Sequence, residues 1–354
     1  MPKPYPPKGR GALSNPVNRF APTTSDFEPV PDDELPARIA TVEIDERPKT
    51  IISRNRSPDV PFEQSVNPYR GCEHGCIYCY ARPSHAYWDL SPGLDFETHI
   101  ICKTGAAERL EQELRAPNYR CKPITLGANT DPYQPIEQHR QITRELLKVL
   151  LRYRHPVSII TKGALISRDL DILAELARQQ LCTVMISLTT LDPQLKRSLE
   201  PRAAGPNTRL NAIRELTAAG VPVGVLVAPL IPMINDRELE AIVEASAAAG
   251  ARSAGYIFLR LPHEVKELFR EWLDCHYPER AEHVMSLIRQ SRDGRENDSR
   301  FGARMRGEGL FADMIAQRFR LALKRHGLLQ RDQLPLRTDL FAPPPQAGDQ
   351  FSLF

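Results

Sequence analysis

The segment NPYRGCEHGCIYCYARPSHAY, residues 67–87, places Cys72, Cys76 and Cys79 in a C-x3-C-x2-C pattern, with glycines that supply turns. Three thiolates on one short loop can bind three corners of an iron–sulfur cubane, which leaves one iron without a protein thiolate. A substrate or cofactor could chelate that iron. The segment therefore predicts a 4Fe–4S cluster with an open corner.

Around this loop, short apolar runs alternate with segments of helical period, which is typical of parallel β/α architecture. The expected strands are 65–71, 98–103, 124–129, 157–161, 183–189, 223–228 and 255–261, and the expected helices between them are 106–114, 137–151, 168–178, 208–219 and 236–248. The pattern predicts an α/β fold, a partial (β/α)6 TIM-like barrel. A doubly wound open sheet is the alternative.

Composition divides the chain into four parts. Twelve of its 32 prolines precede residue 62, which predicts a Pro-rich N-terminal arm over 1–61 and the barrel over 62–262. After Pro262 the pattern is helical, so we expect a C-terminal helical region over 263–330. Three consecutive prolines and few apolar residues near the end predict a flexible tail over 331–354.

Bulk properties limit the class of protein. No apolar run approaches the roughly 20 residues of a membrane span, and residues 1–20 do not resemble a signal peptide. Seven cysteines without an export signal argue against a disulfide framework. We therefore expect a cytoplasmic protein with no membrane contact. The net charge of +3 alone implies no partner.

The cysteine spacing, with Tyr78 before the third cysteine, resembles the radical S-adenosylmethionine (SAM) superfamily, whose loop follows the first barrel strand. The resemblance implies an enzyme with a 4Fe–4S cluster on Cys72, Cys76 and Cys79 and with SAM bound to the open iron. Tyr78 would contact the adenine. One electron, from a partner such as flavodoxin or ferredoxin, would cleave SAM to methionine and a 5′-deoxyadenosyl radical.

Two further segments resemble SAM-binding motifs of the superfamily. LGANTDPYQP (126–135) corresponds to the motif that receives the SAM amino group, and ISLTTLDPQLKRSLEPR (186–202) to segments that bind the ribose and carboxylate. The alternatives are a capped turn and a surface Glu200–Arg202 salt bridge. The implied SAM contacts are Asn129, Thr130, Asp131, Ser187, Glu200 and Arg202.

Within the superfamily, GCEHGCIYCYARP and ANTDPYQP resemble the spore photoproduct lyase-related, DNA repair photolyase-like proteins over about 50–261. This implies lyase or modifying chemistry on nucleic acid, as in DNA repair. However, Ala128 stands where true spore photoproduct lyases carry a hydrogen-donating cysteine, and Cys121 is expected at the wrong end of the barrel. Neither residue is assigned that role, and no catalytic residue is named.

Two other features bear on partners. The end of the chain resembles a bacterial sliding-clamp binding peptide, with Gln350, Leu353 and Phe354 as contacts; the alternative is an apolar tail that folds back on its own domain. A basic group could track nucleic-acid phosphates, although such runs are often solvated faces. Its members are Arg295, Arg300, Arg304, Arg306, Arg318, Arg320, Lys324 and Arg325.

Three alternatives remain open at this point. The three thiolates could hold zinc with His74 or His85 as the fourth ligand. The radical chemistry could act on a peptide or small molecule instead of nucleic acid. The protein could also be a non-catalytic iron–sulfur or zinc adaptor.

Overall fold

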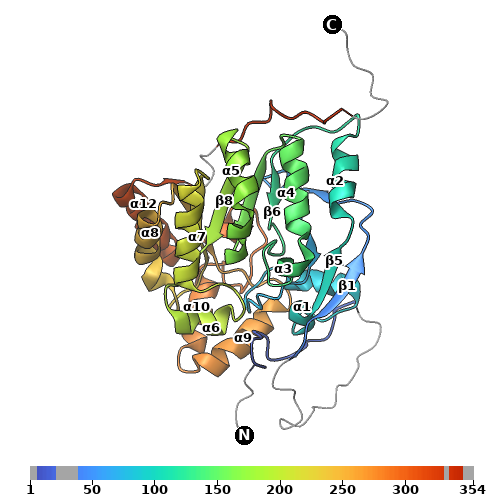
Figure 1. Cartoon of the computed structure of the whole chain (residues 1–354). Helices are drawn as coiled ribbons and strands as arrows, with labels where there is room; N and C mark the ends of the chain where they lie inside the picture. The colour runs from blue at the N-terminus through green and yellow to red at the C-terminus, as the bar shows by residue number, and fades with distance from the viewer. Residues whose placement is uncertain (1–5, 21–38, 331–334, 346–354) are drawn as a thin grey trace.

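A computed structural model describes residues 6–20, 39–330 and 335–345 (Figure 1). Its main sheet has the strand order β11-β10-β9-β8-β7-β6-β3-β2. Neighbouring strands from β3 to β11 are parallel, whereas β2 pairs antiparallel with β3. The bounds are β2 (Ile52–Arg54), β3 (Gln64–Val66), β6 (Ile124–Leu126), β7 (Val157–Thr161), β8 (Cys182–Ser187), β9 (Val223–Leu230), β10 (Ser253–Phe258) and β11 (Leu329–Gln330).

The predicted partial barrel is confirmed, because the strands from β3 to β10 follow one another across the sheet in chain order. The described strands do not close, since β2 and β11 are left as edges. In Figure 1 the helices α2, α4, α5, α7 and α8 stand side by side along one face of the sheet. Their bounds are α2 (Ala106–Leu114), α4 (Ile142–Arg152), α5 (Leu170–Arg178), α7 (Pro206–Ala218) and α8 (Leu239–Ala248).

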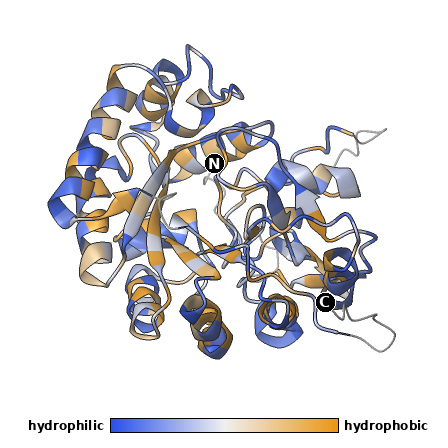
Figure 2. Cartoon of the chain, turned by 90° about the horizontal axis from the view of Figure 1, so that it is seen from above, coloured by the Kyte–Doolittle hydropathy of each residue, from blue (hydrophilic) through white to orange (hydrophobic). Residues whose placement is uncertain are grey.

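Apolar side chains between the strands and these helices form the main core, and the view in Figure 2 shows apolar residues concentrated on the strands. Within the sheet, every residue of the central strands β8 and β9 is buried. Strands buried on both faces are expected in a parallel sheet with helices packed on it. This rigid layer fixes where the loops at the carboxyl ends of the strands begin.

Two predicted strands differ from the expected arrangement. Pro68 has no N–H to donate, and the strand predicted over 65–71 separates around it into β3 and β4 (Tyr69–Arg70). The strand predicted over 98–103 is β5 (His99–Lys103), but it lies outside the barrel. It forms a second sheet in the order β1-β5-β4, with β1 (Val42–Glu46) supplied by the N-terminal arm.

The helix predicted over 137–151 is also broken, at Gln141, whose φ is +51°. Short α3 (Glu137–Arg140) ends there, and the Glu137 carboxylate accepts hydrogen bonds from the backbone N–H groups of Thr143 (3.0 Å) and Arg144 (3.3 Å). This contact caps α4. The helices predicted from residues 168 and 236 start as 3-10 turns, η2 (Ala164–Asp169) and η3 (Asp236–Glu238).

A second apolar cluster lies beneath the cysteine loop, where the C-terminal helices meet it. Trp272 is fully buried there, and its Nε1 donates to the Ser198 carbonyl at 3.1 Å. The last long helix instead extends the barrel layer, because Arg318 donates to Glu240 of α8 at 2.7 Å. The remaining helices are η1 (Arg82–Trp88), α1 (Asp95–Thr98), α6 (Pro193–Leu199), α9 (Val265–His276), α10 (Ala281–Gln290), α11 (Ala303–Arg306) and α12 (Leu310–His326).

Parts of both ends of the chain pack on the barrel. In the predicted arm, the backbone N–H groups of Gly11 and Ala12 each donate to the Glu97 carboxylate at 2.9 Å. The tail was predicted to be flexible, but residues 335–345 are held: the Ala342 N–H donates to the Tyr153 carbonyl at 3.1 Å. The apolar side chains of this stretch explain the difference, since Leu340 and Phe341 pack against the main core.

Two further expectations concern the clamp-binding end of the chain and membrane contact. The clamp-binding residues Gln350, Leu353 and Phe354 lie outside the described residues, so that partner stays a prediction. In the part of the chain that is described, no helix combines the length and apolarity needed to cross a bilayer.

Candidate active site

The loop that follows β4 holds Cys72, Cys76 and Cys79 close to the carboxyl end of the sheet. The side chains of the first two are buried and that of the third is partly buried. The turn between them requires a glycine at position 75, where φ is +65° and a Cβ would approach Glu97 Oε2 to 2.8 Å. The backbone thus folds the three thiols inward.

Without a bound cation, the surroundings hold these three thiols in their protonated form. Burial raises the pKa of all three, and neighbouring carboxylates add to the rise for Cys72 and Cys76. For Cys72 the main carboxylate is Asp131, and for Cys76, whose pKa rises to about 12, it is Glu200. Because thiolates are the ligating form, a bound cation would offset the unfavourable charge and displace the protons.

Within the described structure, the nearby histidines do not complete a zinc site with these thiols. Among the described residues, no three His, Cys, Asp or Glu side chains converge on one point that a single metal ion could occupy. His74 Nδ1 lies 3.3 Å from Asp131 Oδ2, and His85 Nε2 lies 3.1 Å from the His99 carbonyl, so both rings have other partners. A cubane spreads its three thiolates over three irons. The zinc alternative is not supported.

The cysteines open onto a cavity of about 790 Å³ at the carboxyl ends of the parallel strands. Ligand sites in parallel β/α proteins form at this end. Ala128 also lines the cavity, whereas Cys121 does not, so the three loop cysteines are the thiols that line it within the described structure. The predicted site residues on its wall are Cys72, Cys76, Tyr78, Cys79, Asn129, Asp131 and Ser187.

The segment after β6 supports the cysteine loop from below. Asp131 faces His74 and accepts hydrogen bonds from Thr161 Oγ1 (2.6 Å) and the Lys162 N–H (2.7 Å). Burial alone would raise the pKa of Asp131, but these partners hold it at about 2. Gln134 is fully buried; its Oε1 accepts from the Glu73 N–H at 2.9 Å, and its Nε2 donates to the Gly71 carbonyl at 3.2 Å.

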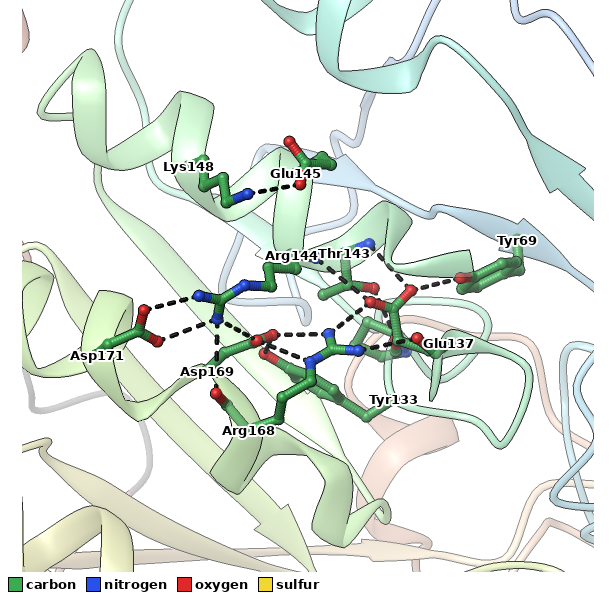
Figure 3. A network of polar contacts seen from close by, with 11 residues as sticks. Tyr69, Tyr133, Glu137, Thr143, Arg144, Glu145, Lys148, Arg168, Asp169 and Asp171 are labelled. Carbon is green, nitrogen blue, oxygen red and sulfur yellow. Dashed lines mark hydrogen bonds and ion pairs between the residues drawn. The ribbon is translucent and has the colours of Figure 1, made fainter. Parts of the chain in front are cut away.

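A buried polar network anchors this segment to the helices (Figure 3). Arg168 Nη2 contacts Glu137 Oε1 at 2.7 Å, and Tyr69 Oη also donates to the Glu137 carboxylate. Tyr133 Oη donates to Asp169 at 3.1 Å. Because Tyr69 precedes the cysteine loop and Tyr133 belongs to the DPYQP stretch, the network ties both parts of the site to one scaffold.

Glu200 lies behind Tyr78 and does not line the cavity. Tyr78 Oη and Thr189 Oγ1 both donate to Glu200, the latter at 2.6 Å, and Arg209 forms an ion pair with it. Burial opposes ionisation of Glu200, but Arg209, followed by Lys162, outweighs it and holds the pKa at about 2. The carboxylate therefore fixes the Tyr78 ring.

Three predicted SAM contacts are placed away from the cavity wall. Glu200 is one. Thr130 is buried and its Oγ1 donates to the Tyr69 carbonyl at 2.7 Å. Arg202 pairs with Glu73 at 2.8 Å and Glu200 pairs with Arg209, so the alternative of a Glu200–Arg202 salt bridge is wrong, while the SAM roles stay predictions. These three side chains lie away from the wall because they bind residues that are distant in sequence. The spacing of residues along the chain does not reveal such contacts.

Lys162 is a cavity residue that the sequence analysis missed. It directly follows β7, and its Nζ lies 5.9 Å from the centroid of the Tyr78 ring. It forms no ion pair with a carboxylate of the described residues. Its position one residue beyond a parallel strand could have identified it, because such positions face the ligand site.

Five of the eight members of the basic group predicted near the C-terminus fall into two sets. Arg318 pairs with Glu240 at 2.7 Å and Arg300 with Asp298 at 2.6 Å, so these two are surface ion pairs. Arg304, Arg306 and Arg320 line the cavity together with Arg260, which the sequence analysis did not single out.

Comparison with known proteins finds chains of similar sequence. An uncharacterized protein of Mycobacterium bovis is 40% identical over 233 residues, which cover 65% of this chain and 68% of the relative. One from Methanocaldococcus jannaschii is 26% identical over 217 residues, covering 61% and 77%.

Solved structures share the fold. Spore photoproduct lyase complexed with dinucleoside spore photoproduct aligns with a TM-score of 0.57 at 16% identity, covering 80% of this chain and 79% of that one. A mutant lyase with bound AdoMet and the same dinucleoside gives a TM-score of 0.58 at 15% identity and the same coverage.

Residues 66–245, just over half of the chain, match the family model described as the radical SAM superfamily. The match begins at the end of β3 and contains all three loop cysteines as well as the segments around Asp131 and Ser187. The chain therefore belongs to the radical SAM superfamily, enzymes that use a 4Fe–4S cluster and SAM.

Proposed function

We propose that this radical SAM enzyme acts on nucleic acid, in repair or modification of a base. The observation that carries the proposal is the cavity, which joins the three cysteines on one wall to four arginines on another. Clustered cations that face a cavity favour a polyanionic substrate. The similarity to a lyase whose structure contains a dinucleoside photoproduct agrees with it.

Cys72, Cys76 and Cys79 would hold the cluster. When bound, the cluster supplies the electron that cleaves SAM and so generates the 5′-deoxyadenosyl radical. The chain's own residues do the positioning: Glu200 fixes the Tyr78 ring, and Asp131 and Gln134 fix the loop. Lys162 offers a cation to a carboxylate near the thiols. Asn129 and Ser187 offer polar groups on the wall.

The residue at position 128 of the cavity wall limits which reaction the enzyme can carry out. Because Ala128 has no thiol and no other described wall residue besides the three loop cysteines supplies one, we infer that hydrogen return to a substrate radical does not use a wall cysteine. A base modification, or repair with a different hydrogen donor, fits this wall better than thymine-dimer reversal.

We also infer the cellular compartment of the enzyme and the source of its electron. All seven cysteines are free thiols in the structure, which suits a reducing cytoplasmic compartment. The electron would come from a small redox protein such as flavodoxin or ferredoxin.

The test is transfer of deuterium from labelled nucleic acid into 5′-deoxyadenosine by the anaerobically reconstituted full chain. Pools of deuterated single-stranded DNA and RNA are compared with deuterated peptide mixtures. We expect label to enter 5′-deoxyadenosine only from a nucleic-acid pool. Label arriving from the peptides alone would overturn the nucleic-acid proposal while leaving the radical chemistry intact.

A further inference from the structure

Arg260 has an unusual environment for a guanidinium group. It follows β10 by two residues and lines the cavity. Its Nε is buried and has no hydrogen-bond partner, and its Nη1 lies 3.9 Å from Met305 Sδ. Arginine carries five N–H donors, and a thioether sulfur is a weak acceptor. Most of the hydrogen-bonding capacity of Arg260 is therefore unused.

The neighbours of Arg260 do not neutralise it. Burial, followed by the nearby Arg304 guanidinium, lowers the pKa of Arg260. Arg304 itself pairs with Asp59, with 2.7 Å between Nε and Oδ2. On the cavity wall the described carboxylates are Asp59 and Asp131, and both already have partners. The wall thus has more cations than anions.

Further unpaired groups lie on the same wall. Arg306 and Arg320 are exposed residues that line the cavity, and neither forms an ion pair with a carboxylate of the described chain. Burial raises the pKa of Tyr256 while the charges of Arg306 and Arg320 act against it, so both cations lie near that phenol. Tyr256 Oη is buried and has no hydrogen-bond partner.

The buried, unpaired donors of Arg260 and Tyr256 cost free energy unless a ligand satisfies them. We propose that Arg260, Arg306, Arg320 and Tyr256 form a subsite for a phosphodiester group of the substrate, an inference that rests on the proposed nucleic-acid function. Guanidinium forks match phosphate oxygens in geometry, and a phenol O–H can donate to the same group.

The aromatic surroundings identify the phosphate as part of a nucleotide. The Tyr80 side chain is 46% exposed, lines the cavity, and its ring centroid lies 5.4 Å from the Arg260 guanidinium. A ring beside a phosphate-binding cation is an arrangement that stacks a base of a single-stranded or extruded segment. SAM carries one carboxylate, and Lys162 on the cysteine side already offers it a cation. Three additional guanidinium groups exceed that need.

The experiment measures how the affinity of the full chain, reconstituted with cluster and SAM, for a fluorescent single-stranded DNA oligonucleotide depends on salt. Each phosphate contact on a single strand contributes about 0.7 to the slope of log affinity against log salt. We expect the double variant R306Q/R320Q to bind at least about tenfold more weakly, with a slope shallower by about 1.4. R260Q should also weaken binding.

The controls separate the subsite from general effects. Arg325 is exposed on the same helix and does not line the cavity, so R325Q removes one cation without touching the subsite. It should leave both affinity and slope near wild type. R306K/R320K keeps the charges and should retain the slope while losing affinity, because lysine lacks the guanidinium fork. Cluster absorbance and SAM affinity are measured for every variant to verify folding.

The outcomes distinguish failure of the phosphodiester subsite from failure of the proposed nucleic-acid function. If wild type binds with a salt slope and R306Q/R320Q behaves like R325Q, the subsite is wrong and the nucleic-acid function stands. A loss of SAM affinity in R306Q/R320Q without loss of DNA affinity would assign the arginines to SAM and overturn the subsite. If wild type binds neither DNA nor RNA oligonucleotides at any salt concentration, the nucleic-acid function fails, and the subsite fails with it.

Discussion

Buried ionised groups surround the cysteine loop, and each has a specific counterpart. Glu200 pairs with Arg209, and Asp131 accepts hydrogen bonds from Thr161 and the Lys162 backbone. Such pairs contribute little net stability, but removing one partner is costly because it leaves a charge buried alone. At the scale of single residues, these contacts serve geometry: they orient Tyr78 and the loop.

The Gly75 position tests whether the loop fold depends on close packing. Gly75→Ala would place a Cβ 2.8 Å from Glu97 Oε2 at a φ of +65°. We expect a loss of about 2 kcal/mol or more in the free energy of unfolding. Gly294 is the matched control, because its φ is +78° and a Cβ there meets nothing within 4 Å.

Urea unfolding of both variants measures the difference. Gly294→Ala carries the backbone cost alone and should lose about 1 kcal/mol. Equal losses in the two variants would show that contact with Glu97 does not matter.

Glu200→Gln should lower the free energy of unfolding at neutral pH by about 3 kcal/mol, because it leaves the Arg209 charge buried without a counter-charge. The pH dependence has a definite sign. The pKa of Glu200 falls from 4.5 to about 2 on folding, so its contribution is present above pH 4.5 and is lost as the pH falls toward 2.

Urea unfolding across this pH range checks the Glu200 prediction. Wild type should lose more stability between pH 4.5 and about 2 than the variant does. Exposed Glu279, changed to Gln, is the control and should behave like wild type. If Glu200→Gln lost as much stability in acid as wild type does, the acid-dependent loss could not be assigned to Glu200.

At the scale of elements, the segment after β6 acts as a support for the loop after β4. Gln134 hydrogen-bonds both the Glu73 N–H and the Gly71 carbonyl, and Thr130 binds the Tyr69 carbonyl. The resemblance assigned this segment to SAM, and Asn129 and Asp131 do reach the cavity. Thr130 and Gln134 of the same segment lie away from the cavity wall and hold the loop after β4 in place.

Gln134→Ala should therefore loosen the cluster site. Loss of two buried hydrogen bonds should cost about 2 kcal/mol of stability, and the reconstituted cluster should lose iron faster to a chelator. Gln138→Ala, an exposed glutamine in the next turn, is the matched control. Iron loss followed by absorbance should be faster in the first variant only. Equal rates in both would remove the supporting role.

Local patterns were sufficient to predict several elements. β7 and α2 have the predicted bounds, because each is a continuous apolar or amphipathic run with clear ends. The break at Gln141 was missed, since it depends on the Glu137 carboxylate that caps α4. Likewise, the cysteines followed from spacing, and the position of Lys162 just after a strand was a usable signal, whereas the environment of Arg260 required the packed sheet.

At the scale of the whole molecule, the open sheet brings distant segments to one cavity. The cysteine loop belongs to the start of the barrel, and Arg306 and Arg320 come from α11 and α12 near its other edge. Asp59 and Arg304 link the two edges by an ion pair. This arrangement lets one cavity combine a cluster site with a cationic wall.

The central claim is that Cys72, Cys76 and Cys79 hold the cluster that cleaves SAM. The most direct measurement is 5′-deoxyadenosine production from SAM and dithionite by the full chain, reconstituted anaerobically, with Cys76→Ser compared with Cys121→Ser. Cys121 does not line the cavity, so its variant should match wild type, while Cys76→Ser should produce none. Production by Cys76→Ser at the wild-type rate, or none by a cluster-loaded wild type, would contradict the claim.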